Sequence, residues 1–256
     1  MRIYLGFDDT DDHDAPMGTG RLVREFSYKL PDVFSLQGIV RHQLPRLDNI
    51  PFTSNNSSAC AIIDMTNDGS LDTLRRLAIE HLEIHCAPGS DPGLCLVRES
   101  DVTPDVVEYG QLVTSRRVTQ KDAMQTAGDI ELYGLGGTND GIIGALAAVG
   151  LTKYGWCGRF IEYGILRDLP ASLRVHDLTD AGISVVSVDR DPLVPQPEDM
   201  VVDANWIRPS LWAGQPMLQL RQVRHGVWET AHGKRKKKHA PGMKKDKSVT
   251  FVGTAQ

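Results

Sequence analysis

The chain has 256 residues, of which 41% are hydrophobic and 24% charged, and its formal net charge is −5 at pH 7. This composition is ordinary for a globular protein and excludes wholesale disorder, and no apolar run approaches the roughly 20 residues of a membrane helix. Aromatic residues make up only 6%, which disfavours a surface of exposed rings that stack on bases.

The cysteines and the first residues favour a cytoplasmic protein. Cys60, Cys86, Cys95 and Cys157 include no Cys-x-x-Cys pair, so their spacing excludes a zinc ribbon and indicates no disulfide framework. The opening sequence MRIYLGFDDT turns acidic at once and lacks the apolar region of a secretory signal. We therefore expect a soluble, cytoplasmic protein with reduced thiols.

Hydrophobic periodicity predicts strands and helices that alternate along the chain. Strands are expected at residues 2–7, 35–41, 58–65, 94–97, 159–166 and 183–188. Helices are expected at 19–30, at 71–82 after an N-cap at Ser70, from Thr103-Pro104, from Thr119 to Ala127, and after the glycine loop near residue 140. Short strands and turns follow from residue 206, and the alternation indicates a mixed α/β (α+β) fold.

Five aspartates lie within seven residues directly after the first strand: Asp8, Asp9, Asp11, Asp12 and Asp14. Carboxylate oxygens are the ligands that Mg²⁺ prefers, and a helix that begins behind them offers free N–H groups to an anion. The segment therefore predicts a site for Mg²⁺ and a triphosphate, and a solvated acidic turn is the alternative. The loop fits neither an EF-hand nor a Walker A motif, because it lacks their glycine, glutamate and lysine positions.

A second glycine-rich segment precedes a helix of small residues. Its glycines are Gly134, Gly136, Gly137, Gly141 and Gly144. Their spacing does not match a Rossmann fingerprint. Two interpretations stay open, namely close packing of the helix and a backbone surface that a substrate approaches.

Several motifs together resemble a known family. GFDDTD, PMGT, RL…IPFTSNNSSA, SDPG and DGIIGALAAVGL occur in this order over residues 1–190. Their order and spacing are similar to those of the archaeal-type tRNA(Ile) 2-agmatinylcytidine synthetases. The resemblance implies a kinase-like domain that binds ATP and Mg²⁺ at residues 1–118 and a ferredoxin-like domain at 119–232. The family's OB-fold and zinc ribbon are expected to be absent.

The resemblance also implies roles for individual residues. It assigns Asp8, Asp9 and Asp11 to metal binding and, with Thr19, to catalysis. It assigns to the binding of ATP the residues Thr10, Gly18, Gly20, Arg46, Asn56, Pro92 and Gly93. The chain differs from the family at two places where cations would contact phosphates. Thr53 and Asn55 stand where the family has a lysine and an arginine. Asn139-Asp140 precedes the helix at a position where the family is basic.

The expected function is that of an ATP- and Mg²⁺-dependent phosphoryl-transfer or ligase enzyme. Its acceptor is a tRNA nucleotide or a small molecule, with an amine as the co-substrate. The alternative is a non-catalytic nucleotide- or RNA-binding module that retains the fold.

Two further features leave alternatives open. Residues 234–247 hold eight Lys or Arg and one Asp, which leaves 20 basic and 32 acidic residues in the rest of the chain. We expect a basic, flexible tail over 233–256, which either attracts polyanions or is only solvated. Glu162, with Arg159 and Arg167 near it in sequence, fits a pocket for a cationic second substrate or a surface ion pair.

Overall fold

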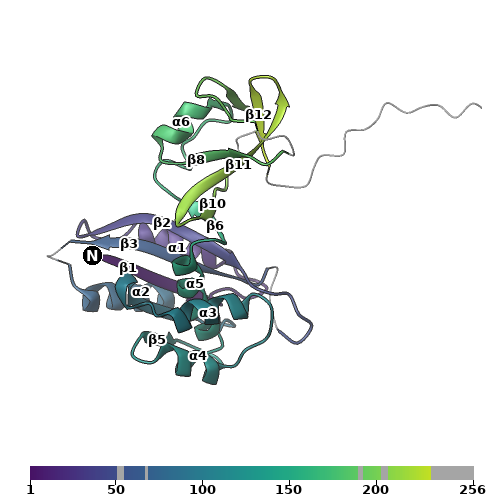
Figure 1. Cartoon of the computed structure of the whole chain (residues 1–256). Coiled ribbons are helices and arrows are strands. Elements are labelled where there is room, and N and C mark those ends of the chain that lie inside the picture. The colour runs from purple at the N-terminus through teal and green to yellow at the C-terminus, as the bar shows by residue number, and fades with distance from the viewer. Residues whose placement is uncertain (51–54, 67–68, 190–192, 203–206, 232–256) are drawn as a thin grey trace, which may run out of the picture.

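The structure is a computed structural model of the whole chain (Figure 1). It describes residues 1–50, 55–66, 69–189, 193–202 and 207–231. The expected basic tail lies outside the described residues, as does the PFTS portion of the segment IPFTSNNSSA. No helix in the described ranges is long and apolar enough to cross a membrane.

The first 162 residues contribute six neighbouring strands, in the order β5-β4-β1-β3-β2-β6. All five strand pairs are antiparallel. The strands are β1 (Arg2–Asp8), β2 (Phe34–Gln43), β3 (Ser57–Met65), β4 (Gly93–Arg98), β5 (Glu131–Gly134) and β6 (Arg159–Glu162).

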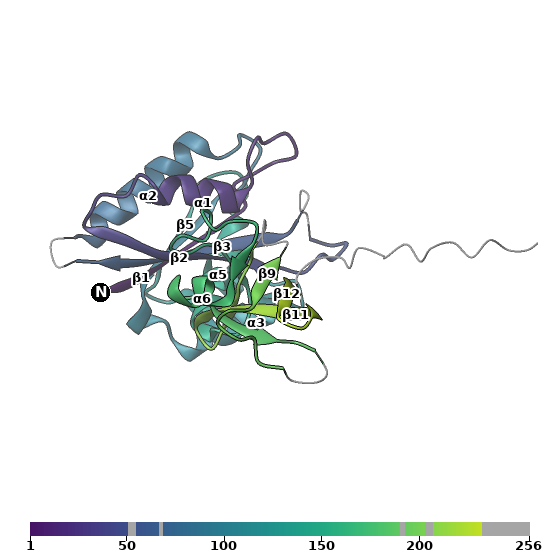
Figure 2. The same cartoon turned by 90° about the horizontal axis from the view of Figure 1, so that it is seen from above.

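Helices cover both faces of this sheet. The α1 helix (Thr19–Ser27) and the α2 helix (Leu71–His85) pack on one face. The opposite face carries α3 (Pro104–Val113), α4 (Gln120–Ala127) and α5 (Gly141–Tyr154), and a short 3₁₀ helix, η1 (Glu99–Asp101), precedes them. Figure 2 shows α1 and α2 on one side of the strands and α3 on the other.

Alternating side chains of β1 explain why it lies in the centre. Ile3, Leu5 and Phe7 are fully buried in the core beneath α1 and α2, whereas Tyr4 belongs to the core on the α5 side. Side chains of successive strand residues point to opposite faces, so a strand that is apolar at nearly every position is buried on both. This arrangement fixes the end of β1, and therefore Asp8, between the two helical layers.

The remaining strands form a smaller β-rich part with a core of its own around the fully buried Trp228 (Figure 1). Its elements are β7 (Leu173–Arg174), α6 (Val175–Asp180), β8 (Ser184–Ser187), β9 (Met200–Val202), β10 (Ser210–Trp212), β11 (Gln215–Arg224) and β12 (Val227–Thr230). Pairing of β10 with β6 joins it to the first sheet.

The mixed α/β class is confirmed. Residue 118, the expected end of the first domain, lies between α3 and α4, which both contact α5. The β5 strand, which follows residue 118, pairs with β4. The sheet and its helical layers thus continue without a break in packing to β6.

Most predicted elements are present, with shifted ends. The strand expected at 159–166 ends at Glu162, because Gly164 adopts a left-handed conformation in the turn that follows. Ser70 occupies the N-cap of α2 as expected, and Thr119 and Asp122 form a capping box at the start of α4. The β5 strand was not predicted, since it has only four residues and none of them is fully buried.

Candidate functional site

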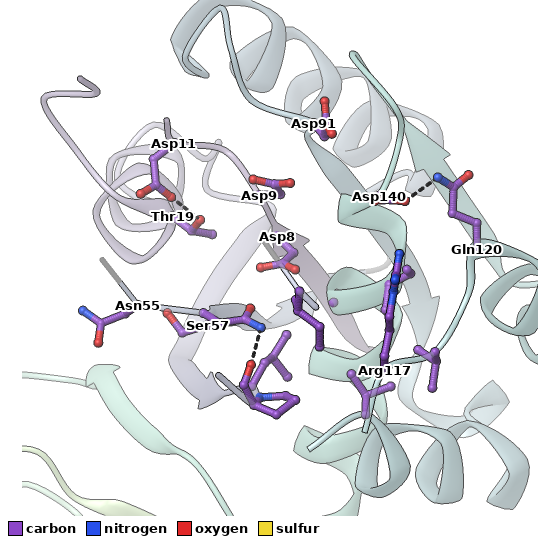
Figure 3. A pocket seen from close by; sticks show the side chains of 18 of the residues that line it. Asp8, Asp9, Asp11, Thr19, Asn55, Ser57, Asp91, Arg117, Gln120 and Asp140 are labelled. Carbon is purple, nitrogen blue, oxygen red and sulfur yellow. Dashed lines mark hydrogen bonds between the residues drawn. The ribbon is translucent and has the colours of Figure 1, made fainter. Parts of the chain in front are cut away.

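A cavity of about 690 Å³ opens beside the C-terminal end of β1 (Figure 3). Five segments surround it: the acidic loop after β1, the stretch from the end of β2 to the start of β3, the loop before β4, the connection from α3 to α4, and the start of α5. Val113 and Ile143 are among its apolar lining residues, and charged and uncharged polar side chains make up most of the remaining lining. The cavity therefore combines an apolar floor with charged walls, as ligand sites commonly do.

The acidic wall begins with Asp8 and Asp9. Burial raises the pKa of Asp8 to about 8, and the charges of Asp9 and Asp11 add to this. Burial also raises the pKa of Asp9 to about 6, with contributions from Asp91, Asp11 and Asp140. With Asp12, six aspartates thus line one cavity, and a bound cation would relieve their repulsion.

The backbone at Asp9 holds this wall in place. Asp9 has a φ of 51°, in the left-handed region that side chains other than Asn and Asp rarely adopt. The turn directs the chain out of the sheet immediately after Asp8. Consecutive carboxylates consequently reach the cavity, whereas an extended strand would send one of them to each face.

Thr19 lies at the start of α1 and connects the helix to the acidic loop. Its hydroxyl donates a hydrogen bond to Oδ1 of Asp11 (3.2 Å) and accepts one from the hydroxyl of Thr10 (3.0 Å). Thr10 and Thr19 are both buried. The network orients the Thr19 hydroxyl toward a carboxylate at the positive end of a helix dipole.

The glycines of α5 allow the helix to approach the acidic wall. A Cβ on Gly144 would lie 1.8 Å from Oδ2 of Asp8, and a Cβ on Gly141 would lie 2.3 Å from the carbonyl oxygen of Asp91. Any side chain there would displace the acidic groups or the backbone. Close packing, one of the two interpretations of this segment, therefore holds for both glycines, and Gly144 also lines the cavity.

Basic residues that the sequence analysis did not select also line the cavity. Arg116, Arg117 and Lys121 come from the connection between α3 and α4 and from the first turn of α4, and all three are exposed. Figure 3 shows Arg117 and Gln120 across the cavity from Asp9 and Asp11. The signal available in the sequence was the pair Arg116-Arg117 directly before a helix cap, a short basic run between two elements.

A hydrogen-bond network fixes the beginning of α5 and the adjacent loop. Gln120 donates from Nε2 to Oδ1 of Asp140 (2.5 Å) and to the carbonyl oxygen of Thr138 (2.7 Å). Asp91 accepts bonds from the backbone N–H and the hydroxyl of Thr138. Asp91 and Asp140 are thus held in place by hydrogen bonds from neutral donors, and both residues line the cavity.

The structure brings part of the predicted set together. The cavity lining includes five of these residues: Asp8, Asp9, Asp11, Thr19 and Asn56. Six others do not line it, namely Thr10, Gly18, Gly20, Arg46, Pro92 and Gly93. Of these, Gly18 is the N-cap of α1, and Arg46 donates a hydrogen bond to Asn55. Gly93 permits close contact between β4 and α5, because a Cβ on Gly93 would lie 2.0 Å from a backbone carbon of Gly141.

The carboxylates of the cavity limit the kind of metal site that this protein can form. In the part of the chain that the structure describes, no group of three or more His, Cys, Asp or Glu side chains lies close enough to hold a metal ion. Mg²⁺ commonly binds one or two carboxylates and takes its other ligands from water and substrate phosphates. Asp8 and Asp9 fit this mode, and they do not fit a site made entirely of protein ligands.

Solved structures with a similar fold include two kinds of enzyme that act on tRNA. The chain is similar to a tRNA fluorescent labeling enzyme (TM-score 0.51, 22% identity, 59% of this chain and 36% of that chain). It is similar to the same extent to TiaS in its complex with an isoleucine tRNA and ATP (TM-score 0.51, 22% identity, 59% and 36%). For apo TiaS, an agmatidine synthetase of that tRNA, the TM-score is 0.50 and the identity 21%, over 59% and 35%.

These similarities show a common fold over part of each molecule. The chain spans about a third of the length of the structures that it matches. No protein-family model matches the chain, and no curated protein matches its sequence.

Proposed function

We propose that the protein is an ATP- and Mg²⁺-dependent phosphoryl-transfer or ligase enzyme of tRNA modification, related to the tRNA(Ile) 2-agmatinylcytidine synthetases. The observation that carries the proposal is the cavity itself, with the acidic wall at Asp8 and Asp9 and the basic side chains of Arg116 and Arg117. Carboxylates for a divalent cation beside arginines for phosphates are the components that a nucleoside triphosphate requires.

The acidic wall would hold the cation. Asp8 and Asp9 would hold the Mg²⁺, and the bound cation would supply positive charge close to the phosphates of the nucleotide. The burial and repulsion that raise the pKa of both carboxyls in the free protein would then be offset. Arg116, Arg117 and Lys121 would replace the cations that the sequence lacks at residues 53, 55 and 139–140.

Thr19 would serve the reacting phosphoryl group. Its hydroxyl donates to Asp11 at 3.2 Å, so this carboxylate orients the hydroxyl and would take its proton. The oxygen would then form a bond to the γ-phosphorus of ATP while the bond from that phosphorus to the β,γ-bridging oxygen breaks, and ADP would leave. The hydrogen bond from Thr10 fixes the same oxygen from the other side. The residues would thus act mainly by positioning and charge, as in most phosphoryl transfer.

The comparisons support a tRNA substrate. The similar structures include TiaS bound to an isoleucine tRNA with ATP, and TiaS bound to the same tRNA, AMPCPP and agmatine. By this analogy the acceptor is a tRNA nucleotide and the co-substrate an amine. The kinase-like and ferredoxin-like assignments and their boundary at residue 118 stay predictions.

The test is nucleotide consumption by the purified full chain. We expect ATP to be consumed only with Mg²⁺ and faster in the presence of tRNA transcripts and agmatine, as followed by chromatography of the nucleotides. Asp8→Asn should abolish turnover. Asp14→Asn is the matched control, because Asp14 belongs to the same loop, is exposed and does not line the cavity. Metal-dependent ATP binding without consumption would indicate the non-catalytic module instead.

A further inference from the structure

Arginine side chains from distant segments converge beside α1, outside the cavity. We define the arginine cluster as Arg24 on α1, Arg41 on β2, Arg159 on β6, Arg167 after β6 and Arg208 before β10. None of the five lines the cavity. No sequence pattern indicates this convergence, because the residues are scattered between positions 24 and 208.

The pairing of β2 with β6 and the lowered pKa values show that the arginines of the cluster lie near one another. Arg41 and Arg159 are direct partners in the β2–β6 pair, where like charges destabilise a sheet. Burial and the charges of Arg167, Arg24 and Arg41 lower the pKa of Arg208 to about 10. Burial lowers the pKa of Arg41 as well. The fold therefore maintains a concentration of positive charge that costs stability.

Among the residues that the structure describes, two carboxylates act on these five arginines. Glu162 is 6% exposed, and its Oε2 accepts bonds from the Tyr28 hydroxyl (2.5 Å) and from Nε of Arg167 (3.3 Å). Asp11 acts on Arg41 from the acidic loop. Glu162 therefore forms an ion pair with Arg167, the alternative that the sequence left open, although its own carboxylate is buried and Arg167 is only partly exposed. Within the described part of the chain, the five arginines thus outnumber the two carboxylates that act on them.

The cluster runs from the cavity toward the C-terminal part. Nε of Arg41 donates to the hydroxyl of Ser57 (2.9 Å), and Ser57 lines the cavity. Arg24 lies on the helix whose first residue, Thr19, also lines it. Arg208 lies next to Pro209, whose carbonyl oxygen binds the N–H of Phe160 where the two parts of the structure join. A polyanion on this path would end beside the acidic wall.

We propose that the arginine cluster binds the phosphate backbone of an RNA substrate and so leads one of its nucleotides into the cavity. This inference rests on the proposed function, whose acceptor it specifies as a nucleotide within an RNA chain. Five guanidinium groups spread over four segments suit several successive phosphates better than one small anion. Arginine is the side chain best suited to this contact, because its planar fork matches phosphate oxygens.

The experiment compares two double variants of the full chain. Arg24→Gln/Arg159→Gln removes two positive charges from the cluster at side chains that solvent reaches. Arg76→Gln/Arg98→Gln is the matched control, with the same charge change at exposed residues on α2 and at the end of β4. The probe is a tRNA transcript, and its Kd is measured by fluorescence anisotropy at several salt concentrations.

We expect the cluster variant to bind the transcript about tenfold more weakly at about 150 mM salt, with a salt slope lower by about 1 to 2. The control variant should change neither quantity by more than the loss of overall charge explains. Equal affinities and slopes for the two variants would overturn the inference.

Titration of Mg²⁺-ATP into the same variants separates this inference from the proposed function. The cluster variant should bind ATP like the wild type, because its residues lie outside the cavity. A loss of ATP affinity with unchanged RNA affinity would mean that the cluster holds the nucleotide, which also overturns the inference. Absence of ATP binding in every form would refute the proposed function, and the RNA comparison would still decide the role of the cluster.

Discussion

Replacing Asp8 by asparagine removes a carboxylate that the metal-free fold holds unfavourably. The pKa of Asp8 rises from 3.8 to about 8 on folding, mainly through burial. The folded state therefore binds this proton more tightly than the unfolded state, so the unfavourable contribution is absent below pH 3.8 and grows as the pH rises toward 8. The roughly four pH units between 3.8 and 8 correspond to at most about 6 kcal/mol at pH 8.

Water in the cavity reduces this figure, because Asp8 retains partial exposure. We expect Asp8→Asn to raise the free energy of unfolding by about 1–3 kcal/mol at pH 8 and by much less at pH 4.5. Urea unfolding in EDTA at both pH values measures the difference. A variant that is less stable than wild type at pH 8, or a difference that does not depend on pH, would refute the reasoning.

Three further perturbations test other parts of the structure. Arg117→Gln should weaken Mg²⁺-ATP binding about tenfold in a calorimetric titration without moving the urea midpoint, because Arg117 is exposed and lines the cavity. Gly93→Ala should lower the free energy of unfolding in urea by about 3 kcal/mol or more, because the new Cβ would lie 2.0 Å from the Gly141 backbone. Gly136→Ala is the control: its Cβ would lie 3.4 Å from Pro92, so the loss should be less than about 0.5 kcal/mol. Burial lowers the pKa of His42 from 6.5 to about 3, so the stability that the neutral histidine contributes is complete above pH 6.5 and is lost as the pH falls toward 3. The loss of unfolding free energy caused by His42→Asn should therefore be smaller at pH 4.5 than at pH 7.5, by about 2–3 kcal/mol. Equal cost for the two glycine variants, or a His42→Asn effect that is the same at both pH values, would contradict these accounts.

Hydrophobic periodicity predicted the elements that form the layers around the site. The strand at β1, the amphipathic helix at α2 and the capped start of α4 follow local rules of burial and capping, which a sequence displays directly. The run of charge after an apolar strand indicated where the chain leaves the core and predicted a cation site among five aspartates, and the family resemblance singled out Asp8, Asp9 and Asp11. These residues do line one cavity.

The rest of the site depends on tertiary contacts. Arg116 and Arg117 reach the cavity only because α3 and α4 pack on α5, and Asp91 joins the acidic wall only because β4 pairs with β1. Neither relation has a periodic signal in the chain. Gly93 was selected for ATP, but its position between β4 and α5 has a packing reason, which a glycine in a sequence motif does not distinguish from ligand contact.

The most direct test of the central claim is a calorimetric titration of ATP, with and without Mg²⁺, into the wild type, Asp8→Asn/Asp9→Asn and the control Asp14→Asn. The account predicts binding that requires Mg²⁺, is retained in Asp14→Asn and is lost in the double variant. ATP binding that is unaffected by Mg²⁺ or by loss of the two carboxylates would contradict it, because the acidic wall would then have no part in holding the nucleotide.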